Sequence, residues 1–145
     1  MNEIFRTFHR VRFGECDHAG IVFYPRYGEM SHAVIEAWMR EGLECDMPTI
    51  LQRFGVVHPL VKIEMEFLRP SRYNELLEFS LQVLHLGNSS FTVRIDARCN
   101  DEERVRMKLK LVNTSLQELR PQPIPEELRA KFARFLVAPA VDVTP

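Results

Sequence analysis

The sequence predicts an α+β domain in which an antiparallel sheet of about five strands holds one long helix. Apolar and polar residues alternate with a period of two in several stretches between residues 56 and 111, which is typical of sheet with one buried face. These stretches follow one another without helical crossovers. Residues 24–41 instead carry apolar side chains at helical spacing. A length of 145 residues fits one domain over residues 1–145.

The first elements are a strand over residues 4–13 and then the long helix, from about Tyr24 to Glu41. Pro25 suits the first helical turn because its ring fixes φ and its missing N–H is no loss there. Gly42 is a natural stop. The apolar stripe of this helix consists of Tyr27, Met30, Val34, Ala37 and Trp38.

The later elements are strands and two shorter helices. Residues 47–54 predict a short helix with Pro48 near its start and Gly55 at its end. Strands are expected over residues 56–68, 76–86, 91–99 and 104–111, with His58 among the polar side chains of the first of these. Pro125 opens a final helix, and residues 137–145 form a tail without pattern that we expect to be frayed.

Composition narrows the class of function. Hydrophobic residues make up 46% and charged residues 27%, as in ordinary soluble proteins. A net charge of −1 argues against nucleic-acid or membrane-surface binding, and we find neither a membrane-spanning run nor a signal peptide. The three cysteines form no CxxC, which predicts a cytoplasmic protein without disulfides. His9, His32 and His85 show no metal-ligand spacing, so no metal site is predicted.

The loop before the long helix carries the strongest candidate chemistry. Asp17 lies between Gly14 and Gly20, which permit tight turns. Tyr24 stands where a capping Ser, Thr, Asp or Asn is usual. The first N–H groups of a helix lack partners and carry positive partial charge, so this start can bind a polarised carbonyl oxygen. From the residues alone, a turn-forming Asp17 and a helix start capped by water or by a backbone carbonyl are the favoured interpretations.

Residues 16–27 read Cys-Asp-His-Ala-Gly-Ile-Val-Phe-Tyr-Pro-Arg-Tyr. The pattern Asp-x-x-Gly-x-Val followed by Tyr-Pro-x-Tyr resembles the signature of the 4-hydroxybenzoyl-CoA thioesterase family, a branch of the hot-dog superfamily. The resemblance in element order extends to about Phe135. It implies a hot-dog fold, in which the sheet wraps around the central helix. His18 departs from the family pattern, which often has a small residue or proline there.

The resemblance also implies an activity and an assembly. The chain would be an acyl-CoA thioesterase that releases free acid and CoA from an aromatic acyl-CoA, such as 4-hydroxybenzoyl or benzoyl, or from a short aliphatic one. Asp17 matches the catalytic aspartate, acting as general base or nucleophile, and Tyr24 matches the tyrosine whose backbone N–H binds the thioester oxygen. Hot-dog domains form homodimers, often dimers of dimers, with the site between subunits. Coenzyme A is part of the substrate, so no cofactor is expected.

Further candidates surround this pair. His18, Gly20 and His58 are possible accessory residues. Basic partners for the CoA phosphates are sought in Arg69 and Arg72, and in the strand arginines Arg104 and Arg106. The turn after the third strand has no basic residue, so it offers only neutral donors: Asn88, Ser89 and Ser90.

Three alternatives stay open. Some hot-dog enzymes carry the carboxylate on the central helix, where Glu29 and Glu36 would be the candidates, although their spacing suits surface ion pairs. The chain would otherwise be a non-catalytic hot-dog protein that binds an acyl thioester or a protein partner. The third is a related enzyme on the same fold, either a thioesterase that acts on acyl carrier protein or a dehydratase.

Overall fold

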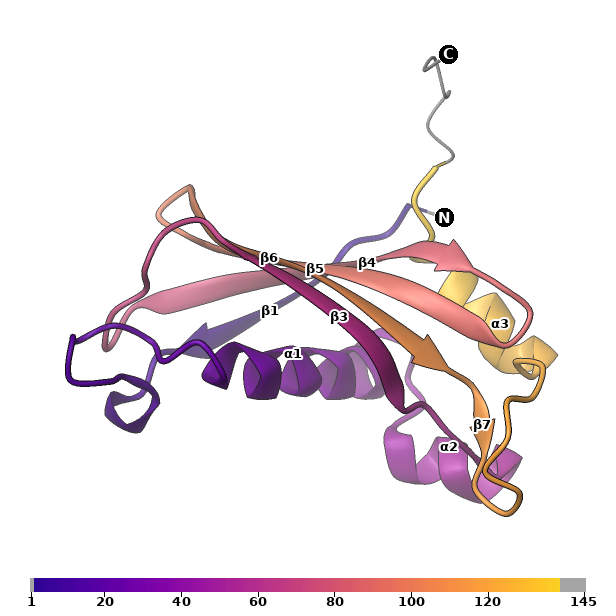
Figure 1. Ribbon diagram of the computed structural model, residues 1–145. Coiled ribbons are helices and arrows are strands. Elements are labelled where there is room, and N and C mark those ends of the chain that lie inside the picture. Colours follow the sequence, from indigo (N-terminus) through magenta and orange to yellow (C-terminus); the bar gives the residue numbers. More distant parts are fainter. Residues whose placement is uncertain (1, 139–145) are drawn as a thin grey trace, which may run out of the picture.

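The computed structural model describes residues 2–138, and its long helix lies across one face of a five-stranded sheet (Figure 1). Helix α1 (Arg26–Ala37) continues into a π-helical segment, η2 (Trp38–Gly42). The strands are β1 (Phe5–Arg10), β3 (Leu60–Phe67), β4 (Leu76–Leu86), β5 (Ser90–Cys99) and β6 (Glu102–Val112). They run in the order β1-β4-β5-β6-β3, and every neighbouring pair is antiparallel. The α+β prediction is therefore confirmed.

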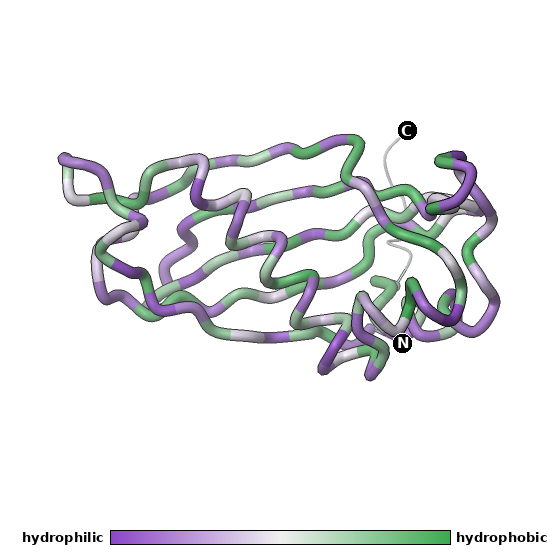
Figure 2. Tube along the Cα trace, turned by 90° about the horizontal axis from the view of Figure 1, so that it is seen from below, coloured by the Kyte–Doolittle hydropathy of each residue, from purple (hydrophilic) through white to green (hydrophobic). Residues whose placement is uncertain are grey.

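Alternation along the three central strands builds the core. Figure 2 shows hydrophobic and hydrophilic segments alternating along the strands, and one side of β4, β5 and β6 is buried with α1. Trp38 is fully buried and stacks on Phe132 with ring centroids 5.3 Å apart. The buried sheet residues are Leu77, Phe79, Leu81, Val83, Phe91, Val93, Ile95, Ala97, Cys99, Val105, Met107, Leu109 and Leu111.

The two shorter helices form where the sequence predicts them. Helix α2 (Met47–Phe54) is capped by Asp46, which accepts a hydrogen bond from the Thr49 N–H at 3.0 Å. It ends at Gly55, whose φ of +67° is the left-handed conformation that glycine adopts freely. Helix α3 (Glu126–Ala133) begins directly after Pro125. No helix in residues 2–138 is long and apolar enough to cross a membrane.

Two predicted strands were too long. The first strand ends at Arg10, and the 3₁₀ helix η1 (Phe13–Glu15) follows it. The expected strand over residues 56–68 is broken at His58-Pro59 into β2 (Val56–Val57), which pairs with β7 (Thr114–Ser115), and β3. Proline has no N–H to give to a ladder. The prediction that His58 shares the polar side of this strand was therefore wrong.

Strand β3 has a sheet neighbour on one side only, because it lies at the end of the strand order beside β6. Its apolar side chains are unusually open: Val61 is 56% exposed and Phe67 is 51% exposed. At the other edge, the Val137 N–H donates to the Val83 carbonyl at 2.9 Å. The start of the predicted tail thus pairs with β4, and residues 139–145 lie outside the described residues.

Candidate active site

The Asp17 loop is a small hairpin closed by short backbone bonds. The Asp17 N–H donates to the Ile21 carbonyl at 3.0 Å, and the Gly20 N–H donates to the Asp17 carbonyl at 2.9 Å. Gly20 has φ of +79°, a left-handed conformation that glycine adopts without strain. The Asp17 carboxylate accepts the Ala19 N–H at Oδ1, 2.8 Å away. Oδ2 receives no hydrogen bond from residues 2–138, so one oxygen is available for chemistry.

The hairpin leads directly into the start of α1. The Phe23 N–H donates to the Glu15 carbonyl at 2.9 Å, which holds the residue before Tyr24 against the segment that leads into the Asp17 hairpin. Pro25 precedes the helix and offers no capping side chain. Within residues 2–138, the Tyr24 N–H has no hydrogen-bond acceptor. An unpaired donor therefore lies just before the positive end of a twelve-residue helix. The first N–H groups of the helix itself, of residues 26–28, donate to the carbonyls of Phe23, Tyr24 and Pro25.

A cleft of about 350 Å³ opens at this helix start. It places Tyr24 against the far end of β3, where the Tyr24 and Phe67 rings meet edge to face at 6.4 Å. Arg69 belongs to the lining and forms an ion pair with Glu102 at 3.6 Å. The remaining lining residues are Ile21, Val22, Tyr27, Leu68 and Pro70. The structure thus brings two of the predicted site residues, Tyr24 and Arg69, into one cleft.

The segment over residues 69–75 fixes the hairpin to the sheet. The Val22 N–H donates to the Ser71 carbonyl at 2.9 Å, and Ile21 forms a bridge with Arg72. Ser71 is fully buried. Burial raises the pKa of the Tyr27 hydroxyl, whose hydrogen bond with Ser71 acts in the opposite direction. Arg72 thus contacts the hairpin through its backbone, and the residue is exposed.

Arg104 holds the residue 69–75 segment in place through side-chain hydrogen bonds. Its guanidinium donates to the Pro70 carbonyl at 3.0 Å and to both carboxylate oxygens of Glu75, at 2.8 and 2.9 Å. The hydrogen bond from Arg104 lowers the pKa of Glu75 to about 2. Sequence reasoning offered Arg104 as a phosphate partner, but only 6% of its side chain is exposed. A register shift between Ala97 and Arg98 turns Arg104 inward, and local alternation does not reveal such a shift.

Of the remaining candidates, His18 shares the hairpin of Asp17, whereas the turn after β4 and the carboxylates of α1 lie elsewhere. His18 is exposed on the same loop. The turn with Asn88, Ser89 and Ser90 lies at the opposite end of the sheet, next to α3 (Figure 1). There the Arg129 side chain donates to the Asn88 carbonyl at 3.1 Å. Glu29 forms a surface ion pair with Arg26 at 2.8 Å, and Glu36 is exposed. Residues 2–138 contain no group of three or more His, Cys, Asp or Glu side chains suited to a metal.

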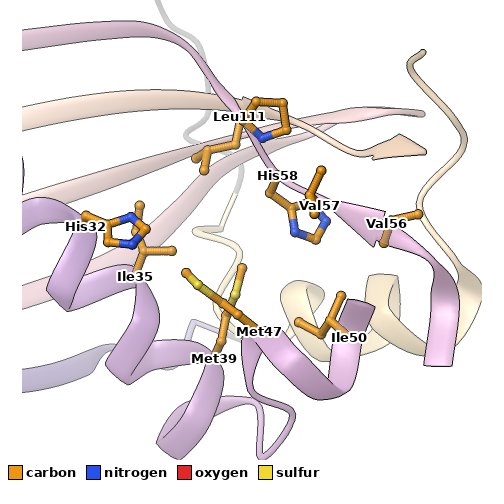
Figure 3. Close-up of a pocket in the computed structure, with 10 residues that line it drawn as sticks. His32, Ile35, Met39, Met47, Ile50, Val56, Val57, His58 and Leu111 are labelled. Carbon is orange, nitrogen blue, oxygen red and sulfur yellow. The ribbon is translucent and has the colours of Figure 1, made fainter. Parts of the chain in front are cut away.

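A second, largely apolar cavity of about 310 Å³ lies at the other end of the sheet, among α1, α2 and β2 (Figure 3). His58 lines it, and its Nε2 lies 2.9 Å from Asn113 Oδ1. The ring also meets Phe91 edge to face at 5.5 Å. Burial lowers the pKa of His58. The other lining residues are His32, Ile35, Met39, Met47, Ile50, Val56, Val57, Pro59 and Leu111.

Comparison with known proteins decides the family. Residues 11–132 match the model of the thioesterase-like superfamily. The chain belongs to this superfamily. A 1,4-dihydroxy-2-naphthoyl-CoA hydrolase of Synechococcus elongatus is 30% identical over 82% of this chain and 88% of its own. A 4-hydroxybenzoyl-CoA thioesterase of Pseudomonas sp. is 30% identical over 59% of this chain and 61% of its own.

The solved structures agree on the fold. A member of the thioesterase superfamily from Jannaschia sp. superimposes with a TM-score of 0.87 at 25% identity, over 95% of this chain and 96% of that chain. The wrapped sheet and central helix are thus the hot-dog fold of this superfamily. The resemblance found in residues 16–27 is confirmed, because these residues lie inside the matched range.

Proposed function

We propose that this superfamily member is an acyl-CoA thioesterase that hydrolyses an aromatic or short aliphatic acyl-CoA to free acid and CoA. One observation carries the proposal. The available carboxylate oxygen of Asp17 and the unpaired Tyr24 N–H lie on one hairpin that leads into α1 and that backbone hydrogen bonds hold in place. The names of two relatives describe aromatic acyl groups on coenzyme A, which supports the aromatic class.

The chemistry needs an attacking oxygen and a donor for the oxyanion. The Tyr24 N–H would donate to the thioester carbonyl oxygen as negative charge develops on it, aided by the helix dipole. As general base, Asp17 would take a proton from water while the water oxygen bonds to the carbonyl carbon. The C–S bond then breaks and the CoA thiolate leaves. As nucleophile, Asp17 would instead form an anhydride that water hydrolyses.

We further propose that the site is completed by a second copy of the chain, as a homodimer or a dimer of dimers. Strand β3 has an unpaired edge and exposed apolar side chains, a combination that favours pairing with another strand. Antiparallel pairing of two β3 strands places the Leu60 end of one beside the Phe67 end of the other.

This pairing joins two features that one chain keeps apart. The Tyr24 cleft lies at the Phe67 end of β3, and the His58 cavity lies just before Leu60. Seven residue steps separate these ends by about 23 Å, which is too far for one benzoyl group to bridge. In the proposed dimer, the cleft of one subunit meets the cavity of its partner, so the acyl group would enter that cavity. Arg69, at the rim of the cleft, is then the nearest candidate for a CoA phosphate.

The test is thiol release from benzoyl, hydroxybenzoyl, phenylacetyl, acetyl, butyryl and longer acyl-CoAs. We expect Asp17→Asn to lower turnover about 10²- to 10⁴-fold without loss of fold. Glu29→Gln makes the same carboxylate-to-amide change on the exposed face of α1, and it should retain wild-type turnover. Normal turnover in Asp17→Asn would remove Asp17 from the site. If no acyl-CoA releases thiol, the chain would be a binding protein or would act on acyl carrier protein. Acylated acyl carrier protein, tested in the same assay, distinguishes these two outcomes.

A further inference from the structure

The hydrogen bonds behind His58 fix which of its nitrogens carries hydrogen. Asn113 is fully buried, and its Nδ2 donates to the carbonyls of Gln122 and Pro123 at 3.0 and 3.2 Å. These two bonds use both amide hydrogens and identify the other amide atom as oxygen. That oxygen faces His58 Nε2 at 2.9 Å. Since a carbonyl oxygen only accepts, Nε2 carries the hydrogen.

The other ring nitrogen is therefore a bare acceptor in neutral His58. Within residues 2–138, Nδ1 has no hydrogen-bond partner. The ring packs edge to face against Phe91 and Phe132, which contact each other, and in Figure 3 it lies above Met39, Met47 and Ile50. Burial lowers the pKa of His58, which favours the neutral ring. The cavity thus combines apolar walls with an acceptor that residues 2–138 leave unpaired.

We infer that this cavity selects acyl groups that carry a hydroxyl, and that the hydroxyl donates its hydrogen bond to Nδ1 of His58. The inference rests on the proposed thioesterase function. It assigns His58 as the residue by which this chain would distinguish a hydroxylated aromatic acyl group, of the kind that the names of two relatives describe, from an unsubstituted one. The ring of such a group removes apolar surface from water along Ile35, Met39 and Ile50. An unsubstituted ring displaces water from Nδ1 without replacing its hydrogen bond. A carboxylated ring offers only acceptors and is disfavoured.

His58 is a specificity-determining residue in this account, separate from Asp17. When an unsubstituted ring fills the cavity, Nδ1 of His58 is buried without a hydrogen-bond donor. We expect this to lower kcat/KM by about 10- to 100-fold relative to a hydroxylated ring. His32 is the other histidine of the lining, but it is exposed. Because His32 shares the lining, the control is His85, which is exposed on β4 and is not part of the lining.

The first experiment measures kcat/KM for benzoyl-CoA and for 3- and 4-hydroxybenzoyl-CoA. Wild type should prefer the better hydroxylated substrate by about 10- to 100-fold. His58→Phe should bring this ratio close to one, and His58→Gln should keep part of it through its amide oxygen. His85→Phe, outside the cavity, should leave the ratio unchanged. Because the ratio compares two substrates on one protein, partial loss of folded enzyme cancels.

Three outcomes separate this inference from the proposed function. If wild type hydrolyses all three thioesters with a ratio near one, the inference is overturned and the thioesterase proposal stands. If wild type hydrolyses none of them but hydrolyses another acyl-CoA of the panel, the inference is overturned and the thioesterase proposal stands. If it hydrolyses no acyl-CoA of the panel, the acyl-CoA thioesterase proposal fails, and the inference that rests on it is withdrawn.

The second experiment reads the ring directly and needs no activity. In ¹⁵N-labelled protein at pH 7, His58 should give the shifts of a neutral ring with hydrogen on Nε2 and none on Nδ1. His58→Gln identifies the signal by its disappearance. A cationic ring, or hydrogen on Nδ1, removes the acceptor and overturns the inference.

Discussion

Glu75 and His58 lie at opposite ends of the same sheet, and the pKa of each is lowered for opposite physical reasons. At the Asp17 end, the hydrogen bond from Arg104 stabilises the charged form of Glu75. At the cavity end, burial disfavours the charged form of His58. The first end uses charge to fix a backbone segment, while the second keeps a neutral side chain next to an apolar space.

This difference separates two tasks that the proposed reaction requires. A hairpin that presents a base and an oxyanion donor must not move, and the Arg104 bonds to Pro70 and Glu75 serve that rigidity. A cavity that accepts an uncharged group gains from neutrality, and Asn113 holds His58 without introducing charge. Variants at each end test whether the two tasks are independent.

The largest effect is expected at the ion pair. Arg104→Met leaves the Glu75 carboxylate partly buried without its partner and the Pro70 carbonyl without a donor, so we expect roughly 3 kcal/mol lower free energy of unfolding. Urea denaturation followed by circular dichroism measures it. Arg106→Met removes a neighbouring arginine with exposed ion pairs, and should change stability little. Equal effects of the two variants would contradict a special role for Arg104.

The Arg104–Glu75 ion pair should also make the stability of the wild-type protein depend on pH in the acid range. The pKa of Glu75 is about 2 in the folded chain and near its ordinary value of 4.5 when unfolded. Between these values the unfolded chain binds the proton and the folded chain does not, so stability is complete above pH 4.5 and is lost as pH falls toward 2. The full loss is roughly 3 kcal/mol.

Urea titrations at several pH values between 5 and 2.5 measure this slope. Glu75→Gln should give a flatter dependence because its amide does not titrate. Glu78→Gln removes a more exposed carboxylate at the start of the same strand, and should keep the wild-type slope. A Glu75→Gln slope as steep as that of wild type would place the acid sensitivity elsewhere.

A smaller effect is expected at the cavity end. Asn113→Leu leaves the carbonyls of Gln122 and Pro123 and the Nε2–H of His58 without partners. We expect about 2 kcal/mol lower stability in urea denaturation. Hydrolysis of benzoyl-CoA should change much less than the preference for hydroxylated rings. Asn88→Ala, in an exposed turn, serves as the control. If the folded Asn113→Leu protein kept the wild-type preference for hydroxylated rings, Asn113 would not be needed to orient His58.

Local pattern predicted the regular part of this molecule. The alternation of residues 76–86, 91–99 and 104–111 identified β4, β5 and β6, and helical spacing identified α1. The residues of the Asp17 loop were found through the family resemblance, because an aspartate between two glycines is common in turns. Strand order was out of reach, since it depends on contacts between residues distant in sequence.

The sequence pattern misplaced His58 and Arg104 and did not single out Asn113. His58 continues an apparently regular pattern, and only Pro59 signalled that the strand breaks there. Arg104 looks like one more arginine on an alternating strand until the register shift between Ala97 and Arg98 is known. Asn113 meets His58 across 55 residues of sequence. Contacts between residues distant in sequence decide the placement of Arg104 and Asn113, whereas the placement of His58 follows from the local break at Pro59.

The smallest effect tests how much of the Asp17 geometry is local. Gly20 has φ of +79° and closes the hairpin through its N–H to the Asp17 carbonyl. An added Cβ meets open space, so Gly20→Ala should cost only the backbone strain of about 1 kcal/mol. Gly14→Ala also faces open space but lacks the positive φ, and should leave urea stability nearly unchanged.

Turnover of the same two variants then separates the hairpin from its support. If Gly20→Ala relaxes the turn, Asp17 shifts and thiol release falls, although Arg104 and Glu75 are intact. If turnover stays at the wild-type level while stability falls, the bonds from Val22 to Ser71 and from Phe23 to Glu15 suffice to hold Asp17. The position of the carboxylate would then be set by the sheet and the residue 69–75 segment rather than by its own turn.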